Sequence, residues 1–518
     1  MEDDTPVIDA DLCHAVAADL LGRGQAGEAE TFYRAALSLA PERPHSWSAL
    51  GLAVLRSGRA EEALLCEREA LRLDPDNPDT HNLLGIVLHA MHALAEAENH
   101  FRGALRLDPR HANATLNLGV IRQSLGHVEE ALTLYRRARA LGVDAARVAN
   151  NLALALAETD DLDGAERECR AALAAAPAWP EAEVNLGMIL LTRGRLAEAW
   201  PHYEARWRVP PLKGLMPYPA DRTWTGAEPL EGKTILLHAE QGFGDTLQFC
   251  RYAPLVAARG ARVILSVPRP LLRVMETLTG IDTVIAADDL LPPVGPPHDL
   301  HCPLLSLPRA LGTTLDTIPA AVPYLSADPA KVADWDGALP RGRRIGLVWA
   351  GGARPDQPHA AAIDKRRSMR LADMAPLGMA SLDAIPLGTT PLGTALPGAG
   401  TAGGCVFVSL QLGPAARQIA AAPFPIVDPT ARLADFADTA ALIQALDLVI
   451  AVDTAVAHLA GALGKPVWLL SRFDACWRWL RDRDDTPWYP TMRLFRQTAP
   501  SDWAGVVERV AEALSRTV

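Results

Sequence analysis

The residues best suited to acid–base chemistry lie in the stretch AEQGFGDTLQF, where an apolar run is followed by two glycines and a carboxylate. Gly242 and Gly244 permit close approach of the backbone to a ligand, and Gln241 lies beside them. Asp245 would repel a phosphate at this turn, but it is suited to take a proton from an incoming hydroxyl group. Its alternative role is to cap a helix. Leu247 replaces the third glycine of G-x-G-x-x-G, so a dinucleotide fingerprint is not supported.

A second group of residues lies in DLVIAVDTAVAHLAGALGKPVW. We expect a buried strand to end at Asp453 and a helix to begin at Thr454. The first amides of a helix form an anion site, so Thr454 and the amides after it could hold a diphosphate. His458 lies one turn further along the same face and could point into the same cleft. The alternative is that His458 is a structural histidine.

A third group combines two predicted strand ends with a short basic segment. The strand of GLVWAGG ends in glycines that can admit a ligand, and the strand of SLQ ends in polar residues. The basic residues of DKRRSM could neutralise phosphates, although such a segment is more often a solvated surface. The candidate ligand-binding residues here are Trp349, Gly351, Lys365, Arg367, Ser409 and Gln411.

Other classes of function find little support. The segment HDLHC has no matching second cluster, so we expect no metal site and no cofactor. The P-loop and nucleophile-elbow motifs are missing from the sequence. The net charge is −12, with 62 acidic and 50 basic residues and no long basic run, so nucleic acid is not an expected partner. Scattered cysteines, an acidic start without a secretory signal and interrupted apolar stretches predict a cytoplasmic protein that does not span a membrane.

The elements before residue 212 repeat with a period of 34 residues. Small residues, alanines and prolines each recur on this period, and two helical patterns meet near the small residue in each unit. The proline series is Pro41, Pro75, Pro109, Pro177 and Pro211. The pattern resembles about six tetratricopeptide repeats over residues 9–211 and predicts an all-α solenoid.

Three asparagines share the same period, namely Asn117, Asn151 and Asn185. A row of amides can bind an extended peptide backbone because each amide offers a donor and an acceptor. The row resembles the asparagine ladder of eukaryotic protein O-GlcNAc transferases and would make these residues peptide-binding. The alternative is that they tie neighbouring helices together, or that the solenoid is a spacer.

The chain changes character after the repeats. Residues 212–231 are rich in Pro and Gly and are predicted to be a linker. Continuous apolar runs alternating with helical segments then predict two Rossmann-like domains, over residues 232–326 and 345–518. Residues 376–404, which are poor in charge and rich in Gly, Pro, Thr and Ala, are predicted to be an irregular insertion.

Together, the motifs EQGFGDTLQFCRY, GLVWAGG, FVSLQLG, DLVIAVDTAVAHLAGALGKPVWLL and RDDTPWYPTMRLFRQ resemble bacterial tetratricopeptide-repeat glycosyltransferases. The catalytic half of that family is similar to ADP-heptose:lipopolysaccharide heptosyltransferases. The resemblance implies the GT-B fold, in which the first domain holds the acceptor and the second holds a nucleotide sugar. It also implies that no metal is needed.

Residue by residue, the resemblance makes Asp245 the general base, with Gln241, Gly242 and Gly244 in the acceptor-side loop. Asp453, Thr454 and His458 match a D-T-x-x-x-H donor motif. The resemblance implies that the third group of residues is donor-binding as well, namely Trp349, Gly351, Lys365, Arg367, Ser409 and Gln411. The family's phosphate-binding lysine has no certain counterpart, and Lys365 or Arg367 could substitute for it. We therefore expect an inverting glycosyltransferase whose nucleotide sugar is a co-substrate.

The resemblance also suggests an acceptor. The repeats would recruit a protein such as flagellin or a surface protein, and a glycan or lipid acceptor is the other possibility. The alternative function is a repeat scaffold whose glycosyltransferase half has lost activity and which binds a protein partner.

Overall fold

The computed structural model describes residues 9–287, 296–352, 358–380 and 404–516. The chain divides into two compact units, Met1–Asn185 and Leu186–Val518. The division falls inside α11 (Pro180–Thr192), the first helix of the sixth predicted repeat.

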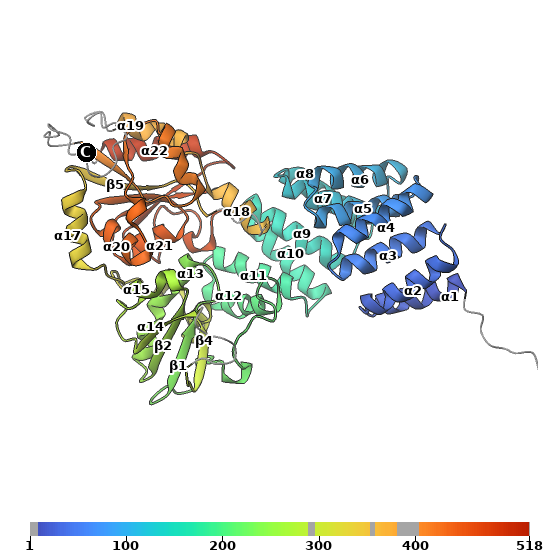
Figure 1. The fold of residues 1–518 in the computed structure, drawn as a ribbon, viewed down its shortest axis with the longest axis horizontal. Helices are drawn as coiled ribbons and strands as arrows, with labels where there is room; N and C mark the ends of the chain where they lie inside the picture. Colours follow the sequence, from blue (N-terminus) through green and yellow to red (C-terminus); the bar gives the residue numbers. More distant parts are fainter. Residues whose placement is uncertain (1–8, 288–295, 353–357, 381–403, 517–518) are drawn as a thin grey trace, which may run out of the picture. The chain divides into compact units, whose positions relative to one another are not determined.

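The N-terminal unit is a stack of helix pairs joined by short turns (Figure 1). Each pair occupies one 34-residue period, which confirms the helical repeat predicted from the sequence. Its described helices are α1 (Ala10–Gly22), α2 (Ala26–Leu39), α3 (Pro44–Arg56), α4 (Ala60–Leu73), α5 (Pro78–Ala90), α6 (Leu94–Leu107), α7 (Ala112–Ser124), α8 (Val128–Ala140), α9 (Ala145–Glu158) and α10 (Leu162–Ala175), followed by the start of α11.

The glycines of the period make room for large side chains on the second helix of each pair. A Cβ atom at Gly85 would lie 2.6 Å from the ring of Phe101, and one at Gly119 would lie 2.6 Å from the ring of Tyr135. Both rings are buried. Because interiors are packed as densely as organic crystals, a larger residue at either glycine would push the two helices apart.

The C-terminal unit begins with the end of α11 and α12 (Leu196–Tyr203) and contains two parallel sheets. The first sheet has the order β3-β2-β1-β4 in the described chain, with β1 at Thr234–His238, β2 at Arg262–Val267, β3 at Thr283–Ala286 and β4 at Leu300–Pro303. Leu236 of β1 is paired with Ile264 on one side and with His301 on the other. Its helices are α13 (Phe243–Phe249), α14 (Ala253–Ala257), α15 (Leu272–Met275) and α16 (Leu307–Ala310).

The segment predicted to be a linker is packed against this first sheet. Thr223 forms a parallel bridge with His301, and the Trp224 N–H donates a 2.8 Å hydrogen bond to the His301 carbonyl. The Trp224 side chain is buried. Residues 212–231 are therefore not simply a linker, because their second half adds to the β4 edge of the sheet.

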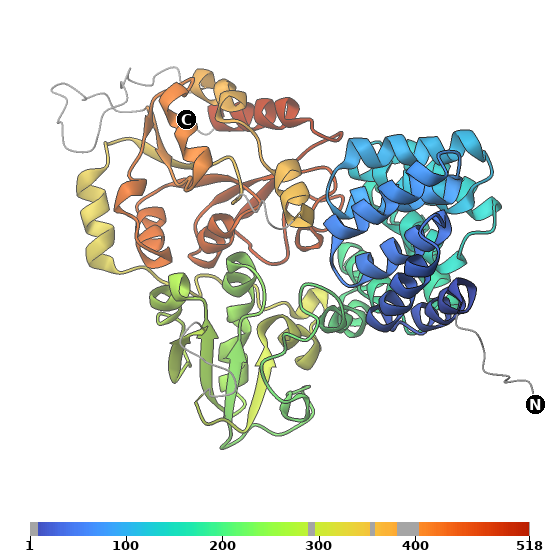
Figure 2. The same ribbon diagram turned by 45° about the vertical axis from the view of Figure 1, so that its right-hand side comes forward.

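The second sheet has the order β10-β9-β8-β5-β6-β7 in the part of the chain that the structure describes. Its strands are β5 (Arg343–Val348), β6 (Cys405–Ser409), β7 (Ile426–Val427), β8 (Leu448–Val452), β9 (Val467–Ser471) and β10 (Met492–Arg496). Helices α19 (Ala375–Ala380) and α22 (Trp503–Ser515) cover one face, and α20 (Phe436–Gln444) and α21 (Ala455–Ala462) cover the other (Figures 1 and 2). Because both faces are covered, the strands read as continuous apolar runs.

Two further helices flank this sheet, α17 (Pro329–Ala338) and α18 (Pro358–Arg367). The insertion predicted for residues 376–404 starts later than expected. Residues up to Ala380 continue α19, and Leu377 is buried in the core of the second sheet. The rest of the predicted insertion, residues 381–403, lies outside the described residues.

Candidate functional site

The predicted base, Asp245, lies in the first turn of α13, just beyond the end of β1. Its Oδ2 accepts a 3.0 Å hydrogen bond from the Gly242 N–H, which closes the first turn of the helix. Its Oδ1 accepts a hydrogen bond from the Arg478 guanidinium in an ion pair. The Asp245 side chain is 22% exposed, so solvent or a ligand can still reach it. The carboxylate is thus held in one orientation by two donors.

Arg478 was not foreseen from the sequence. It lies 233 positions from Asp245, in the segment between β9 and β10. Its guanidinium also donates to Oε1 of Gln248 on α13 and lies 3.2 Å from Cys476 Sγ. The cation is 4.4 Å from the centre of the Trp477 ring. Only the fold brings this arginine to the first half of the unit, and no motif in the sequence marks it.

The predicted diphosphate site is the N-terminus of α21, which follows β8. Thr454 is the N-cap residue, with an extended backbone and no capping hydrogen bond from its side chain. Its Oγ1 is buried and has no hydrogen-bond partner within the described chain. Residues 453–456 are half-exposed, so the first amides of the helix are accessible. The helix end is therefore partly exposed, and beside it lies a buried hydroxyl group with no hydrogen bond in the described chain.

His458 lies inside the protein at the next turn of α21. Its Nδ1 is 2.9 Å from the Tyr489 hydroxyl oxygen, and its Nε2 is 3.8 Å from Asp453 Oδ1. Its ring is stacked on Trp479, with 5.4 Å between ring centres. Burial lowers the pKa of His458 to about 3, although Asp453 acts in the opposite direction. His458 is therefore neutral at pH 7, and its contacts are those of a residue that positions the helix.

The starts of α13 and α21 are in contact. A Cβ atom at Gly244 would lie 2.9 Å from His458 Cδ2 and 3.6 Å from the Ala455 Cα. Any larger residue at position 244 would force the two helices apart. The structure thus brings together the two groups of residues that the sequence analysis singled out first.

The basic segment reaches the same place through one of its arginines. Arg367 Nη1 donates a 3.0 Å hydrogen bond to the Asp453 carbonyl, and two other guanidinium nitrogens donate to Asp364 Oδ1. Gly351 faces this pair, and a Cβ atom there would collide with Asp364. Lys365 is exposed on α18. Arg367 is therefore the cation of this segment that lies beside the start of α21.

Three of the predicted donor-binding side chains face the interior. Trp349 and Ser409 are fully buried, and Gln411 is 3% exposed. Gln411 Oε1 accepts hydrogen bonds from the Trp349 and Ala350 N–H groups at 3.1 and 2.9 Å. Its Nε2 donates to the Ala350 and Leu412 carbonyls. Gln411 therefore ties the backbone after β5 to the backbone after β6.

A second carboxyl group, Glu240, was also missed by the sequence analysis. Its Oε1 accepts 3.1 Å hydrogen bonds from Arg206 Nη2 and the Leu305 N–H, while Oε2 is buried without a partner in the described chain. Burial raises the pKa of Glu240 to about 7, against the effect of Arg206. The neighbouring Gln241 donates to the Tyr203 hydroxyl oxygen at 3.2 Å. The burial of Glu240 could not be predicted from the sequence, because its partners Arg206 and Leu305 are distant in the chain.

Within the residues that the structure describes, no group of three or more His, Cys, Asp and Glu side chains is arranged to hold a metal ion. Among the described helices, none has the length and apolar character needed to cross a bilayer.

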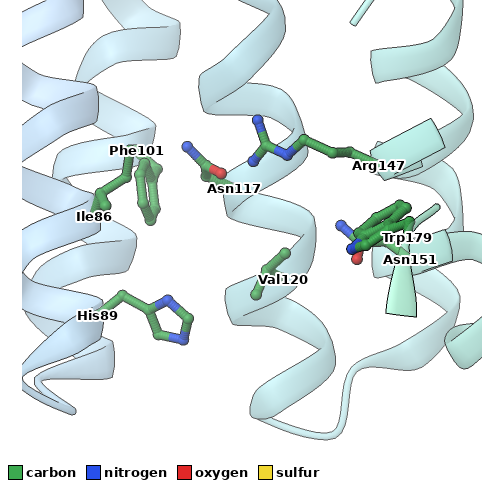
Figure 3. Close-up of a pocket in the computed structure, with 8 residues that line it drawn as sticks. All are labelled: Ile86, His89, Phe101, Asn117, Val120, Arg147, Asn151 and Trp179. Atoms are coloured by element: carbon green, nitrogen blue, oxygen red, sulfur yellow. The ribbon is translucent and has the colours of Figure 1, made fainter. Parts of the chain in front are cut away.

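The N-terminal unit has a groove with a volume of about 320 Å³ (Figure 3). Its lining residues are Ile86, His89, Phe101, Asn117, Val120, Arg147, Asn151 and Trp179. Two of the predicted peptide-binding asparagines, Asn117 and Asn151, are therefore in the groove. Asn117 Nδ2 donates to Asn82 Oδ1 at 2.9 Å, and Asn185 Nδ2 donates to Asn150 Oδ1 at 2.8 Å. Those two amides tie neighbouring helices together, as the alternative interpretation expected.

Comparisons with known proteins match both parts of the chain. Tetratricopeptide-repeat families match residues 55–91 and 88–155, and glycosyltransferase family 9 (heptosyltransferase) matches residues 416–470. The chain is 28% identical over 404 residues to Protein FlbA of Caulobacter vibrioides, a match that covers 72% of this chain and 62% of FlbA.

Solved structures that resemble the chain include two bacterial proteins. One is TTC0263, a TPR protein of Thermus thermophilus, with a TM-score of 0.33 and 23% identity over 35% of this chain and 99% of that one. The other is PilF of Pseudomonas aeruginosa, with a TM-score of 0.34 and 19% identity over 40% of this chain and 93% of that one.

The family matches confirm the tetratricopeptide-repeat solenoid that the 34-residue period predicts. The match to glycosyltransferase family 9 covers β7, α20, β8, α21 and most of β9, including Asp453, Thr454 and His458. The chain thus combines repeats of a type that suggests protein–protein interaction with an α/β region that is similar, in part, to glycosyltransferases.

Proposed function

We propose that this protein is an inverting, metal-independent glycosyltransferase that moves a sugar from a nucleotide sugar to an acceptor hydroxyl group. One observation carries the proposal: the start of α13, with Asp245, meets the start of α21, with Thr454, where Gly244 contacts His458. A carboxylate and an anion site are what acceptor deprotonation and diphosphate departure require. The two sheets would then be the two Rossmann-like domains of a GT-B fold.

The donor would bind at the start of α21. Its diphosphate would accept hydrogen bonds from the first amides of the helix and from Thr454 Oγ1, which has no partner in the described chain. Arg367 beside Asp453 would add positive charge, with Lys365 available from the exposed face of α18. These contacts would stabilise the charge that develops on the leaving diphosphate.

The acceptor would be deprotonated by Asp245. A carboxylate has about two acceptor positions on each oxygen, and the Gly242 N–H and Arg478 each occupy one of them. Each oxygen therefore keeps capacity for a further proton or hydrogen bond. The hydroxyl oxygen would attack the anomeric carbon as its proton passes to Asp245, and the nucleoside diphosphate would leave with the electron pair of the broken bond.

The repeats would recruit a protein acceptor, which could be flagellin or another surface protein, and a glycan or lipid acceptor is the other candidate. The family matches to tetratricopeptide repeats support a protein partner. We place the protein in the bacterial cytoplasm, where nucleotide sugars are available, and expect no nucleic-acid partner.

The test is a panel of nucleotide sugars scored for binding and for donor hydrolysis by the purified chain. Asp245→Asn removes the proposed base but keeps the size of the side chain, so donor binding should persist while transfer falls at least ~100-fold, the usual contribution of a general base. Asp316→Asn is the matched control, because Asp316 is exposed in the same half. Transfer at the wild-type rate by Asp245→Asn would remove Asp245 from the mechanism.

A specific observation also favours the second candidate, a non-catalytic scaffold. Both oxygens of Asp245 already have partners, which is what a carboxylate with a purely structural role would show. The same panel separates the two candidates, because a scaffold would bind no nucleotide sugar.

A further inference from the structure

The groove of the N-terminal unit differs in charge from the solenoid around it. Residues 9–185 contain 27 acidic and 17 basic residues, yet none of the groove's lining residues is acidic. The cation of the lining is Arg147; His89 also lines the groove, but burial lowers its pKa and so disfavours its charged form. A positive groove on an acidic solenoid is selective, because it attracts an anion that the rest of the surface repels.

Arg147 is the cation of this groove that has no counter-ion. It is exposed on α9, and its guanidinium makes no hydrogen bond or ion pair with any described residue. Several other arginines of the solenoid do have counter-ions: Arg122 contacts Glu98 and Glu130, and Arg139 contacts Glu168. In Figure 3 the Arg147 guanidinium points across the groove toward Asn117. The charge of Arg147 is therefore available to a ligand, because no described residue neutralises it.

Amides lie beside this cation. The Asn151 side chain makes no hydrogen bond within the described chain, so its donor and acceptor are both available. Asn117 uses its NH₂ group on Asn82, which leaves its Oδ1 as an acceptor. Together the two amides can bind the N–H and C=O groups of an extended backbone.

The rest of the groove is apolar. Ile86 and Val120 are half-buried, and Phe101 lies beneath them as a fully buried ring. Trp179, which is half-buried, closes the end of the groove near Asn151. A ligand that carries an apolar side chain next to an anionic group could therefore bind with both groups in contact with the groove.

We propose that this groove binds an extended, acidic segment of a protein, with a carboxylate on Arg147 and an adjacent aromatic or large aliphatic side chain against Val120 and Trp179. A guanidinium suits a carboxylate because it can donate two parallel hydrogen bonds. Identifying this partner with the sugar acceptor rests on the proposed function, whereas the binding itself does not depend on it.

The experiment measures binding of the full chain to capped, fluorescein-labelled nonapeptides by fluorescence anisotropy. The peptides differ only at the central residue, which is Glu, Gln or Lys, and carry Phe at the next position. The Glu peptide should bind at least tenfold more tightly than the Gln peptide, a change of about 1.4 kcal/mol. Its advantage should shrink as salt rises from about 50 to 300 mM, because an exposed charge pair is screened.

Variants of the chain test which residues cause the preference for the Glu peptide. Arg147→Ala should remove the preference for Glu over Gln, and Arg147→Glu should reverse it in favour of Lys. Arg136→Ala is the matched control, because Arg136 is an exposed arginine on α8 and does not line the groove. Replacing the Phe of the peptide by Ala, or Trp179 by Ala, should each weaken binding at least about fivefold.

Equal binding of the Glu, Gln and Lys peptides, an equal loss in Arg136→Ala and Arg147→Ala, or no binding of any peptide would overturn the proposal. Nucleotide-sugar binding is measured on the same preparations. If the chain prefers the Glu peptide but binds no nucleotide sugar, the proposed function is wrong and the groove proposal is supported. If nucleotide sugars bind and are hydrolysed but the chain does not prefer the Glu peptide, only the groove proposal is wrong.

Discussion

Glu67 occupies a position at which other repeats place a ring. Tyr33, Phe101 and Tyr135 share its place in the 34-residue period. The Glu67 side chain is fully buried on α4; its Oε2 accepts a 2.9 Å hydrogen bond from Ser48 Oγ, and its Oε1 is left without a partner in the described chain. Burial raises the pKa of Glu67 to about 8, with the Ser48 hydrogen bond opposing it.

This pKa predicts how the stability of the second repeat depends on pH. The Glu67 carboxyl binds its proton more tightly in the folded state than in the unfolded state, where a glutamate has a pKa of about 4.3. The stability that it contributes is therefore complete below about pH 4 and is lost as the pH rises through about 8. At about 1.4 kcal/mol per pKa unit, the free energy of unfolding of this repeat should fall by roughly 2–3 kcal/mol between about pH 6 and pH 9.

Glu67→Gln isolates this effect, because glutamine has the same shape and no charge to lose. We expect the free energy of opening of α4 in the variant, relative to the wild type, to rise by roughly 2–3 kcal/mol from about pH 6 to pH 9. Amide hydrogen exchange of α3 and α4 in the full chain measures it, and comparing variant and wild type at the same pH cancels the intrinsic exchange rate.

The matched control is Glu69→Gln on the same helix. Glu69 is paired with Arg72, and its hydrogen bond with Arg72 lowers its pKa. It is therefore ionised in both states above pH 6, and its replacement should shift protection by the same amount at every pH tested. A pH-independent difference between wild type and Glu67→Gln would show that Glu67 is ionised in the folded repeat and would refute the reasoning.

Three further predictions concern the candidate site. Gly244→Val should lower the rate of transfer at least about tenfold while donor affinity changes little, because the new side chain collides with His458 and shifts α13. Separate measurements of kcat and donor Kd check this prediction, and an equal loss in both would contradict it. Arg478→Gln should lower kcat about 10–100-fold at an unchanged donor KM, because Asp245 loses the charged donor that orients it; Arg478→Lys should recover part of the rate, and no recovery would count against a role in orientation. Thr454→Val should weaken donor binding about 3–10-fold in calorimetry, because the unpartnered hydroxyl group is lost, and unchanged affinity would place the diphosphate elsewhere.

The sequence predicts the fold well where the signal is local or periodic. The 34-residue period predicts each helix pair, and its small residues include Gly85 and Gly119, which make room for a ring on the next helix. Continuous apolar runs identify the buried parallel strands, because both faces of each sheet are covered. The predicted start of the insertion was wrong, because its first residues are apolar enough to complete α19 and bury Leu377.

The site is predicted less completely, because much of it depends on contacts between distant residues. Asp245 and Thr454 could be singled out, since each follows a strand and begins a helix. Arg478 carries no such local signal, and its approach to Asp245 exists only because the segment after β9 packs against α13. The contacts of Gln411 could not be predicted for the same reason: a polar residue at a strand end can face a ligand or hydrogen-bond the backbone, and in this structure its amide binds backbone groups.

The placement of Arg478 has a consequence for the proposed reaction. Asp245 belongs to the first sheet's half, whereas its charged partner belongs to the half that would carry the donor. Arg251 makes a second connection from the first half, since it donates to the Trp488 carbonyl. The proposed base therefore keeps the Gly242 N–H at all times but has its charged donor only while the two halves are together. Because a displaced catalytic group loses most of its effect, an enzyme built this way would transfer sugar to a hydroxyl group, in preference to water, only when acceptor and donor halves are both in place.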